Sequence, residues 1–223
     1  MHPLLTPFPL PLHLKLLFMK KGLFLIGLVV VVAAVYFIFF DKSDNHQNDG
    51  PKQQPLAQSK NGESFNTPFN AMLQAYFGLH DALVNWDTAQ ATAKAASLQS
   101  LLVKVPFDSL KADSAVVLAA KSVASNVTSD CIGITADSSI AEKRRSFYEL
   151  SENLYSLLQT VKYDQQIIYH MRCPMAFGDD KEGFWLSNVS NIINPYIGNK
   201  HPKYHAAMLS CGNVQDSLDY RSK

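Results

Sequence analysis

The chain has 223 residues, of which 47% are hydrophobic, and its formal net charge is +1. It shows no basic patch of the kind that nucleic-acid binding requires, so we expect no nucleic-acid partner. It also shows no Ser-His-Asp order, no phosphate-binding glycine loop and no specific pair of catalytic carboxylates, so the sequence does not indicate an enzyme.

An apolar run without a charged residue extends from Gly22 to Phe40. At about 1.5 Å per residue, a helix of this length nearly crosses the hydrocarbon core of a bilayer. The run ends in bulky aromatic residues, which make a poor cleavage site for a signal peptide. We therefore expect an uncleaved transmembrane helix at residues 22–40.

Charges on either side of the apolar run predict its orientation. Lys20 and Lys21 precede the run and Asp41 follows it, so the positive-inside rule places residues 1–21 in the cytoplasm. If translation begins at the internal Met-Lys-Lys sequence, residues 1–18 are a start-site artefact. We expect a single-pass protein of the inner membrane with its C-terminal domain in the periplasm.

A linker is predicted at residues 41–67. This stretch is rich in Gln, Asn, Ser and Pro and holds almost no large apolar side chains, a composition typical of flexible segments. The folded part is expected to begin near Pro68. It then has about 155 residues, which is enough for one hydrophobic core.

A helical bundle is predicted at residues 68–163. The first helix is indicated by apolar residues at helical spacing: Phe69, Met72, Leu73, Tyr76, Leu79, Leu83. His80 lies on the same face of this helix and is interpreted as a core or surface histidine. A second helix is expected to begin at Asp87, with Gln90 completing a capping box, and to stop at Pro106.

Two further helices follow in the sequence. The third is expected from about Asp113 to Asn126, with Cys131 after its end as a buried or half-buried free thiol. The fourth is expected to start at Ser139, with Glu142 three residues on and this apolar face: Phe147, Leu150, Leu154, Leu157, Leu158, Val161. The charged run at 142–146 is interpreted as a solvated helix face. Short connections predict an all-α, up-and-down four-helix bundle.

The pattern changes after residue 163. Residues 173–212 are rich in Pro and Gly and have no sustained helical period, and irregular segments of this length are uncommon in compact domains unless they are functional or tied down. We expect residues 164–215 to form a metal-binding segment packed on the bundle, followed by a tail at 216–223.

Soft side chains gather in this segment in two clusters. Cys173 and Met175 flank a proline, His170 lies just before them, and Met208 and Cys211 are three residues apart. Thiolate and thioether ligands select copper(I) and similar soft ions, and histidine is an intermediate ligand. These five residues are the predicted ligands of copper(I) or silver(I).

A structural disulfide between Cys173 and Cys211 is the alternative. An exported compartment is oxidising, and such a bond would contribute roughly 3–4 kcal/mol by closing the intervening loop. Met175 and Met208 would then be ordinary packing residues. Under this interpretation the chain is a structural or adaptor protein of the cell envelope.

The same segment resembles a bacterial domain-of-unknown-function family, number 3347. Its motifs are Cys-Pro-Met-Ala, Trp-Leu-Ser, Asn-Pro-Tyr and Met-Leu-x-Cys-Gly, and this chain has each of them in order: Cys173-Pro174-Met175-Ala176, Trp185-Leu186-Ser187, Asn194-Pro195-Tyr196 and Met208-Leu209-Ser210-Cys211-Gly212. Helical stretches upstream also resemble the family. The resemblance extends over about residues 69–215.

The resemblance implies an exported helical domain, sometimes attached to membrane-fusion subunits of copper and silver efflux pumps. The Cys-Pro-Met sequence is also similar to a short segment of heavy-metal-binding domains in such pumps. This chain departs from the family in a longer stretch between Gly198 and Met208, which adds His201 and His205. The function expected from residues and resemblance together is a metal buffer, chaperone or efflux accessory, with a heavy-metal efflux pump as the partner.

Overall fold

A computed structural model of the chain describes residues 61–178 and 181–221. The predicted cytoplasmic N-terminus, the membrane helix at 22–40 and most of the linker lie outside these residues. Of the helices within the described residues, none combines the length and the apolar character that a membrane span needs.

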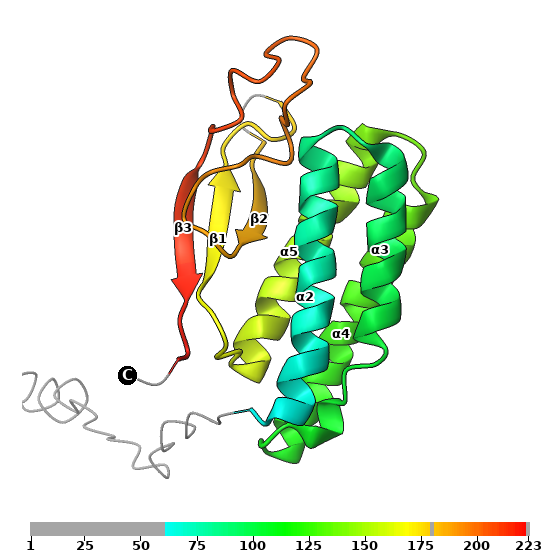
Figure 1. Cartoon of the computed structure of the whole chain (residues 1–223), viewed down its shortest axis with the longest axis vertical. Helices are drawn as coiled ribbons and strands as arrows, with labels where there is room; N and C mark the ends of the chain where they lie inside the picture. Colours follow the sequence, from blue (N-terminus) through cyan, green and yellow to red (C-terminus); the bar gives the residue numbers. More distant parts are fainter. Residues whose placement is uncertain (1–60, 179–180, 222–223) are drawn as a thin grey trace, which may run out of the picture. The chain divides into compact units, whose positions relative to one another are not determined.

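Four helices form the larger part of the fold: α2 (Glu63–Val84), α3 (Thr88–Leu102), α4 (Ser114–Ala136) and α5 (Ile140–Val161), with a short 3-10 helix, η1 (Phe107–Ser109), between α3 and α4. Helices that follow one another in the chain lie side by side (Figure 1). The four predicted helices are confirmed.

The first helix begins earlier than predicted. α2 starts at Glu63, inside the predicted linker, and the Phe65 side chain is fully buried. Asn61 ties this end to the bundle, because its Nδ2 donates a hydrogen bond of 2.8 Å to the carbonyl of Val161 at the end of α5. The folded part therefore includes the last residues assigned to the linker.

Both predicted helix starts have a side-chain N-cap, but only the one at Ser139 is a full capping box, since the Asp87 N–H bonds to the carbonyl of Ala82 and not to Gln90. The Asp87 side chain accepts a hydrogen bond of 2.8 Å from the backbone N–H of Gln90 at the start of α3. At the start of α5, Ser139 and Glu142 form a reciprocal capping box, which satisfies N–H groups that a helix end leaves without partners.

α4 is longer than predicted, since it continues to Ala136. Cys131 therefore lies inside the helix and not after it. Its side chain is fully buried, as expected of a core thiol, and this burial raises the pKa of the thiol to about 12. Such a thiol is protonated at neutral pH and is chemically inert.

Side chains of α2 and α5 meet in the bundle core. The Tyr76 and Phe147 rings stack with their centroids 5.2 Å apart, and the Tyr76 hydroxyl is 2.7 Å from that of Ser151.

All of the residues predicted for the apolar face of the fourth helix are buried. That face was correctly assigned from its spacing.

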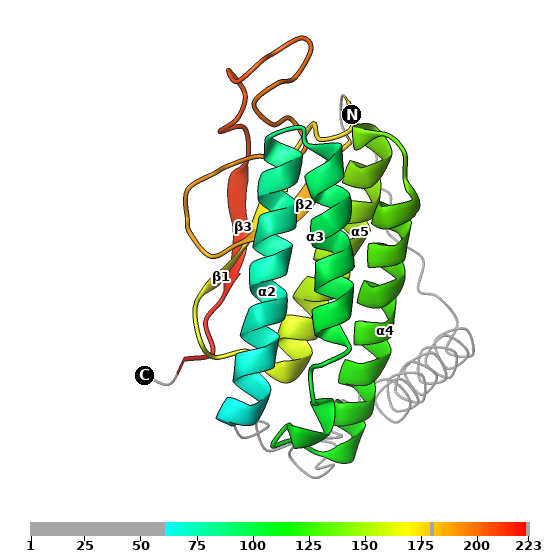
Figure 2. The same ribbon diagram turned by 45° about the vertical axis from the view of Figure 1, so that its right-hand side comes forward.

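A three-stranded antiparallel sheet corrects the all-α prediction. Its strands are β1 (Ile168–Cys173), β2 (Gly183–Ser187) and β3 (Asn213–Leu218), in the order β2-β1-β3. The sheet stands on one side of the helices, with β2 next to α5 (Figures 1 and 2). β3 also takes up the first residues of the predicted tail.

The outer edge of β2 is closed by two tyrosines. The backbone N–H of Leu186 donates 2.9 Å to the hydroxyl of Tyr76 on α2, and the Tyr196 hydroxyl donates to the carbonyl of Phe184. These bonds satisfy backbone groups that an edge strand would otherwise leave open. The bond to Tyr76 also holds the sheet on the bundle.

Candidate metal centre

Cys173 is the last residue of β1 and is fully buried. Its thiol lies beside the Cys211 thiol, the Asn194 side chain and the backbone N–H of Met175, all of which act on its pKa. Cys211 is half-buried, and both side chains are free thiols. The structure thus brings together two predicted ligands from segments that are far apart in the sequence.

Two local features place Cys211 beside the end of β1. Its backbone N–H donates 3.0 Å to the carbonyl of Met208, which closes a turn. Gly212 follows with a φ of +137°, and a Cβ atom on it would lie 2.5 Å from the carbonyl oxygen of Arg172. Only glycine allows this approach without a steric clash, so Gly212 lets the chain pass close to β1.

The surroundings of Cys173 favour the protonated thiol. Burial raises the pKa of Cys173, and the neighbouring Cys211 raises it further, whereas hydrogen bonds from Asn194 and Met175 lower it in part. A metal ion binds the thiolate and not the thiol. Any ion bound here must therefore displace protons from the sulfur atoms.

The two predicted thioether ligands lie in the turns that carry the cysteines. Met175 is two residues after Cys173 and Met208 is three residues before Cys211, and both side chains are half-buried against the hydrophobic core. They are the thioether side chains nearest in the sequence to Cys173 and Cys211.

His170 is placed differently. Its ring is stacked between Tyr155, at 4.2 Å between centroids, and Phe184, at 4.9 Å. Its Nε2 atom is 2.7 Å from a carboxylate oxygen of Glu152. Because side chains alternate along a strand, His170 and Cys173 leave opposite faces of β1, and the structure does not bring this histidine to the thiols.

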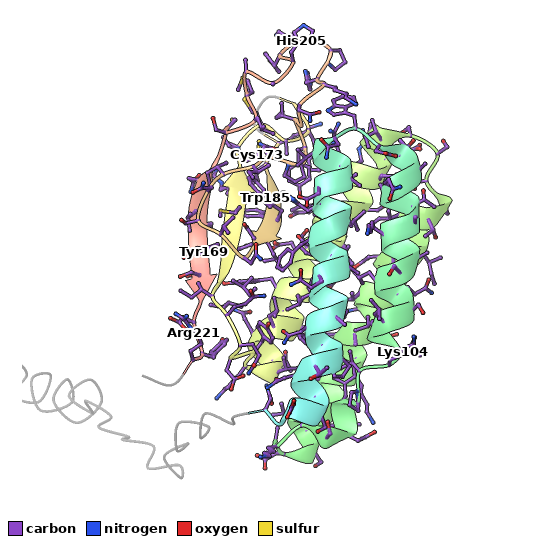
Figure 3. The ribbon with its side chains drawn as sticks, viewed as in Figure 1. Lys104, Tyr169, Cys173, Trp185, His205 and Arg221 are labelled. Carbon is purple, nitrogen blue, oxygen red and sulfur yellow. The ribbon has the colours of Figure 1, made fainter. Side chains whose placement is uncertain are left out.

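The extra histidines lie in the loop that departs from the family pattern. Figure 3 shows His205 at the tip of this loop, whereas Cys173 lies at the end of the sheet. The Nδ1 atom of His201 accepts backbone hydrogen bonds from Lys203 and Tyr204, at 3.1 and 3.2 Å. His201 therefore stabilises a turn, and across residues 61–178 and 181–221 no group of three or more His, Cys, Asp and Glu side chains is arranged to hold a metal ion.

Residues 193–199, which we call the docked segment, are held on the helices mainly through their backbone. The carbonyl of Ile193 is 2.8 Å from Nε2 of His80, and that of Ile197 accepts 3.0 Å from the Trp86 indole. The N–H of Asn199 donates 2.9 Å to the carbonyl of Val84. His80 is buried, as expected, and its role is to hold this segment.

Arg144 is a second anchor of the docked segment and corrects the prediction of a solvated face at 142–146. It is only 5% exposed, and its Nε and Nη2 atoms donate to the carbonyls of Pro195 and Leu83, at 2.7 and 3.0 Å. The guanidinium lies 4.1 Å from the centre of the Trp86 ring. Burial lowers its pKa to about 10, so it stays charged at neutral pH.

Lys143, the residue before Arg144, is also buried. Its ammonium group donates 2.6 and 2.7 Å to the carbonyls of Ile134 and Asp137 at the end of α4. A cation at a helix C-terminus satisfies carbonyls that have no partner in the helix and interacts favourably with the helix dipole. Of the charged run, Arg145 is exposed, as predicted.

Comparison with known families identifies the helical part. Residues 72–166 match a family described as "Protein of unknown function (DUF3347)". This match supports the DUF3347 family assignment for that part of the chain. It confirms the resemblance for the helical stretches, because the DUF3347 match covers the bundle from within α2 to the residues just before β1. The motifs at 173–212 lie outside the match. No curated protein and no solved structure matches the chain.

The DUF3347 match ends before Cys173 and Cys211, so the arrangement of these two cysteines is known only from the structure. The sequence drew attention to Asn194 as part of a motif but not as a residue of the site. Its signal was the Asn-Pro pair, which is typical of a turn. The structure shows that Asn194 is fully buried and contacts both cysteine segments.

Proposed function

We propose that this chain binds one soft monovalent ion, copper(I) or silver(I), between Cys173 and Cys211. The observation that carries the proposal is the contact between these two thiols at the end of β1. Two sulfur donors with thioethers close by in the chain are a ligand set that suits a soft ion.

The small number of zinc-type ligands near the two thiols favours a monovalent ion over zinc. Structural zinc sites have four ligands in a tetrahedron, drawn from Cys, His, Asp and Glu. In the described part of the chain no three such side chains gather, and His170 is engaged with Glu152. Met175 and Met208 would complete the shell of a soft ion but are poor ligands for zinc.

The biological role proposed is that of a buffer, a chaperone or an efflux accessory. The predicted membrane helix at 22–40 would anchor the domain to the inner membrane with the bundle in the periplasm. A heavy-metal efflux pump is the proposed partner. The sequence resemblance and the predicted anchor support this role, and no catalytic function is proposed.

A structural disulfide is the second candidate, and the same contact between Cys173 and Cys211 favours it. Formation of this bond would covalently link the loop that contains the docked segment to the end of β1. In this case the protein would act as an envelope adaptor, and the half-buried Met175 and Met208 would contribute packing only.

Silver(I) binding by the reduced protein tests the proposal. We expect equilibrium dialysis with metal analysis to give one silver ion per chain, and an equal concentration of zinc(II) not to displace it. Because burial keeps Cys173 protonated, silver must displace thiol protons to bind. Below the thiol pKa, the apparent affinity should therefore rise by up to about tenfold per pH unit, as pH increases, for each proton displaced. A reduced protein that binds no silver, or whose affinity does not change between pH 6 and 8, would contradict thiolate ligation.

A further inference from the structure

Asn194 lies at the point where three separate segments of the chain meet. It is fully buried, and all four of its polar atoms have partners. Its Oδ1 atom accepts from the backbone N–H groups of Tyr196 and Ile197, at 2.8 and 3.1 Å, which closes a turn in the docked segment. Its own N–H donates 2.8 Å to the carbonyl of Leu209 and its carbonyl accepts 2.9 Å from Gly198.

The remaining atom of the Asn194 side chain connects the two cysteines. Nδ2 donates 2.7 Å to the carbonyl of Cys211, and the same side chain lies beside the thiol of Cys173, whose pKa it lowers. One carboxamide therefore contacts the backbone of one cysteine and the sulfur of the other. Within residues 61–178 and 181–221, no other side chain contacts both cysteines in this way.

The chemistry of these contacts requires asparagine. A carboxamide supplies an acceptor on one atom and two donor hydrogens on the other. Aspartate is similar in shape and keeps the acceptor, but when ionised it has no donor for Cys211. Serine can close a similar turn through its hydroxyl, but it is too short to extend to Cys211 as well.

The docked segment fixes the position of this carboxamide. The residues on either side of Asn194 are bonded to the helices, Ile193 to His80 and Pro195 to Arg144. The backbone of Asn194 therefore has little freedom, and the direction of Nδ2 is set by the bundle.

We infer that Asn194 is a positioning residue, which holds Cys211 beside Cys173 through its Nδ2 group. The bundle, through the docked segment, would thereby set the distance between the sulfur atoms. The inference deepens the proposed function, because it names the residue that assembles the site, but it concerns the thiol pair itself and can be tested without metal.

Thiol–disulfide exchange with glutathione measures how well the two thiols are held together. In this reaction the protein dithiol is oxidised to the Cys173–Cys211 disulfide, and one oxidised glutathione is reduced to two thiols. The full chain with Cys131→Ala as the common background leaves only this pair of cysteines. We expect Asn194→Asp and Asn194→Ser each to lower the equilibrium constant for disulfide formation by about tenfold or more.

The control is Asn199→Asp, which makes the same change in the docked segment. Nδ2 of Asn199 donates to Asn85 at 2.8 Å, and Asn199 has no recorded bond to either cysteine. We expect its equilibrium constant to equal that of the background protein. The stability of each variant is measured in both redox states, because a purely structural role would destabilise both forms equally and leave the exchange constant unchanged.

Unchanged exchange constants in folded Asn194→Asp and Asn194→Ser would overturn the inference, as would an equal decrease in Asn199→Asp. If one Asn194 variant fails to fold, the other decides. Failure of the proposed function gives a different result, since loss of silver binding by the background protein leaves the effect of Asn194 on exchange intact.

Discussion

Replacement of Cys173 by serine is expected to weaken silver(I) binding by at least ~100-fold, or about 2.7 kcal/mol. The change replaces a soft sulfur by a hard hydroxyl that stays protonated at neutral pH. Cys173 is fully buried at the end of β1, so no solvent-exposed group can take its place. The affinity is measured by competition against a chelator of known silver affinity.

Cys211→Ser should give a loss of similar size, whereas Met175→Leu should give a smaller one. Leucine keeps the size of methionine but has no thioether, so it removes only an additional donor. Cys131→Ala is the matched control, since that thiol is buried in α4 and has a pKa raised to about 12. Equal affinities of the Cys173→Ser and Cys131→Ala proteins would show that the thiol pair is not the site.

Removal of the Arg144 side chain should produce the largest change in stability. Arg144→Ala removes the side-chain donor of the buried Pro195 carbonyl and one of the two donors of the Leu83 carbonyl. It also removes the cation from the face of Trp86. We expect a loss of roughly 2–5 kcal/mol in the free energy of unfolding, measured by urea denaturation.

Arg145→Ala is the control for this change, because it deletes the same charge from the next residue of α5. Arg145 is exposed, and its removal should change stability by less than about 0.5 kcal/mol. Arg144→Lys should recover only part of the loss, since an ammonium group cannot bond two carbonyls with the geometry of a guanidinium. Equal effects of the two alanine substitutions would mean that the docked segment does not depend on Arg144.

The helices were predictable because local signals and apolar spacing agreed. Ser139 and Glu142 gave the start of α5, and its apolar face followed from regular spacing. The end of α4 was missed because its last third contains β-branched residues and Gly133, which have low helix propensity. Burial of Val127, Cys131 and Ile134 in the core stabilises this part of the helix in spite of that composition.

The sheet could not be predicted from alternation. A strand with one solvent face shows a period of two, but β1 and β2 are buried on both faces. The β1–β2 pair His170 and Leu186 lies on one face, and the pair Met171 and Trp185 lies on the other. β3 is almost wholly exposed and polar, so it resembles a tail. Neither pattern is typical of a half-buried strand.

The candidate site was predictable in its residue types but not in its assembly. The soft side chains in two clusters predicted that Cys173 and Cys211 would meet, and the structure places their thiols in contact. No local pattern indicates that His170 faces α5, or that Asn194 and Arg144 contact backbone groups distant in the chain. Such contacts depend on the tertiary fold and leave no local pattern.

X-ray absorption at the copper edge of the copper(I)-loaded, reduced protein tests the central claim most directly. We predict at least two sulfur atoms at about 2.3 Å from the ion, a distance typical of metal–thiolate bonds, and their loss in the variant with both Cys173→Ser and Cys211→Ser. A first shell of nitrogen or oxygen only, or a sulfur shell that persists in the double variant, would contradict metal binding by this thiol pair.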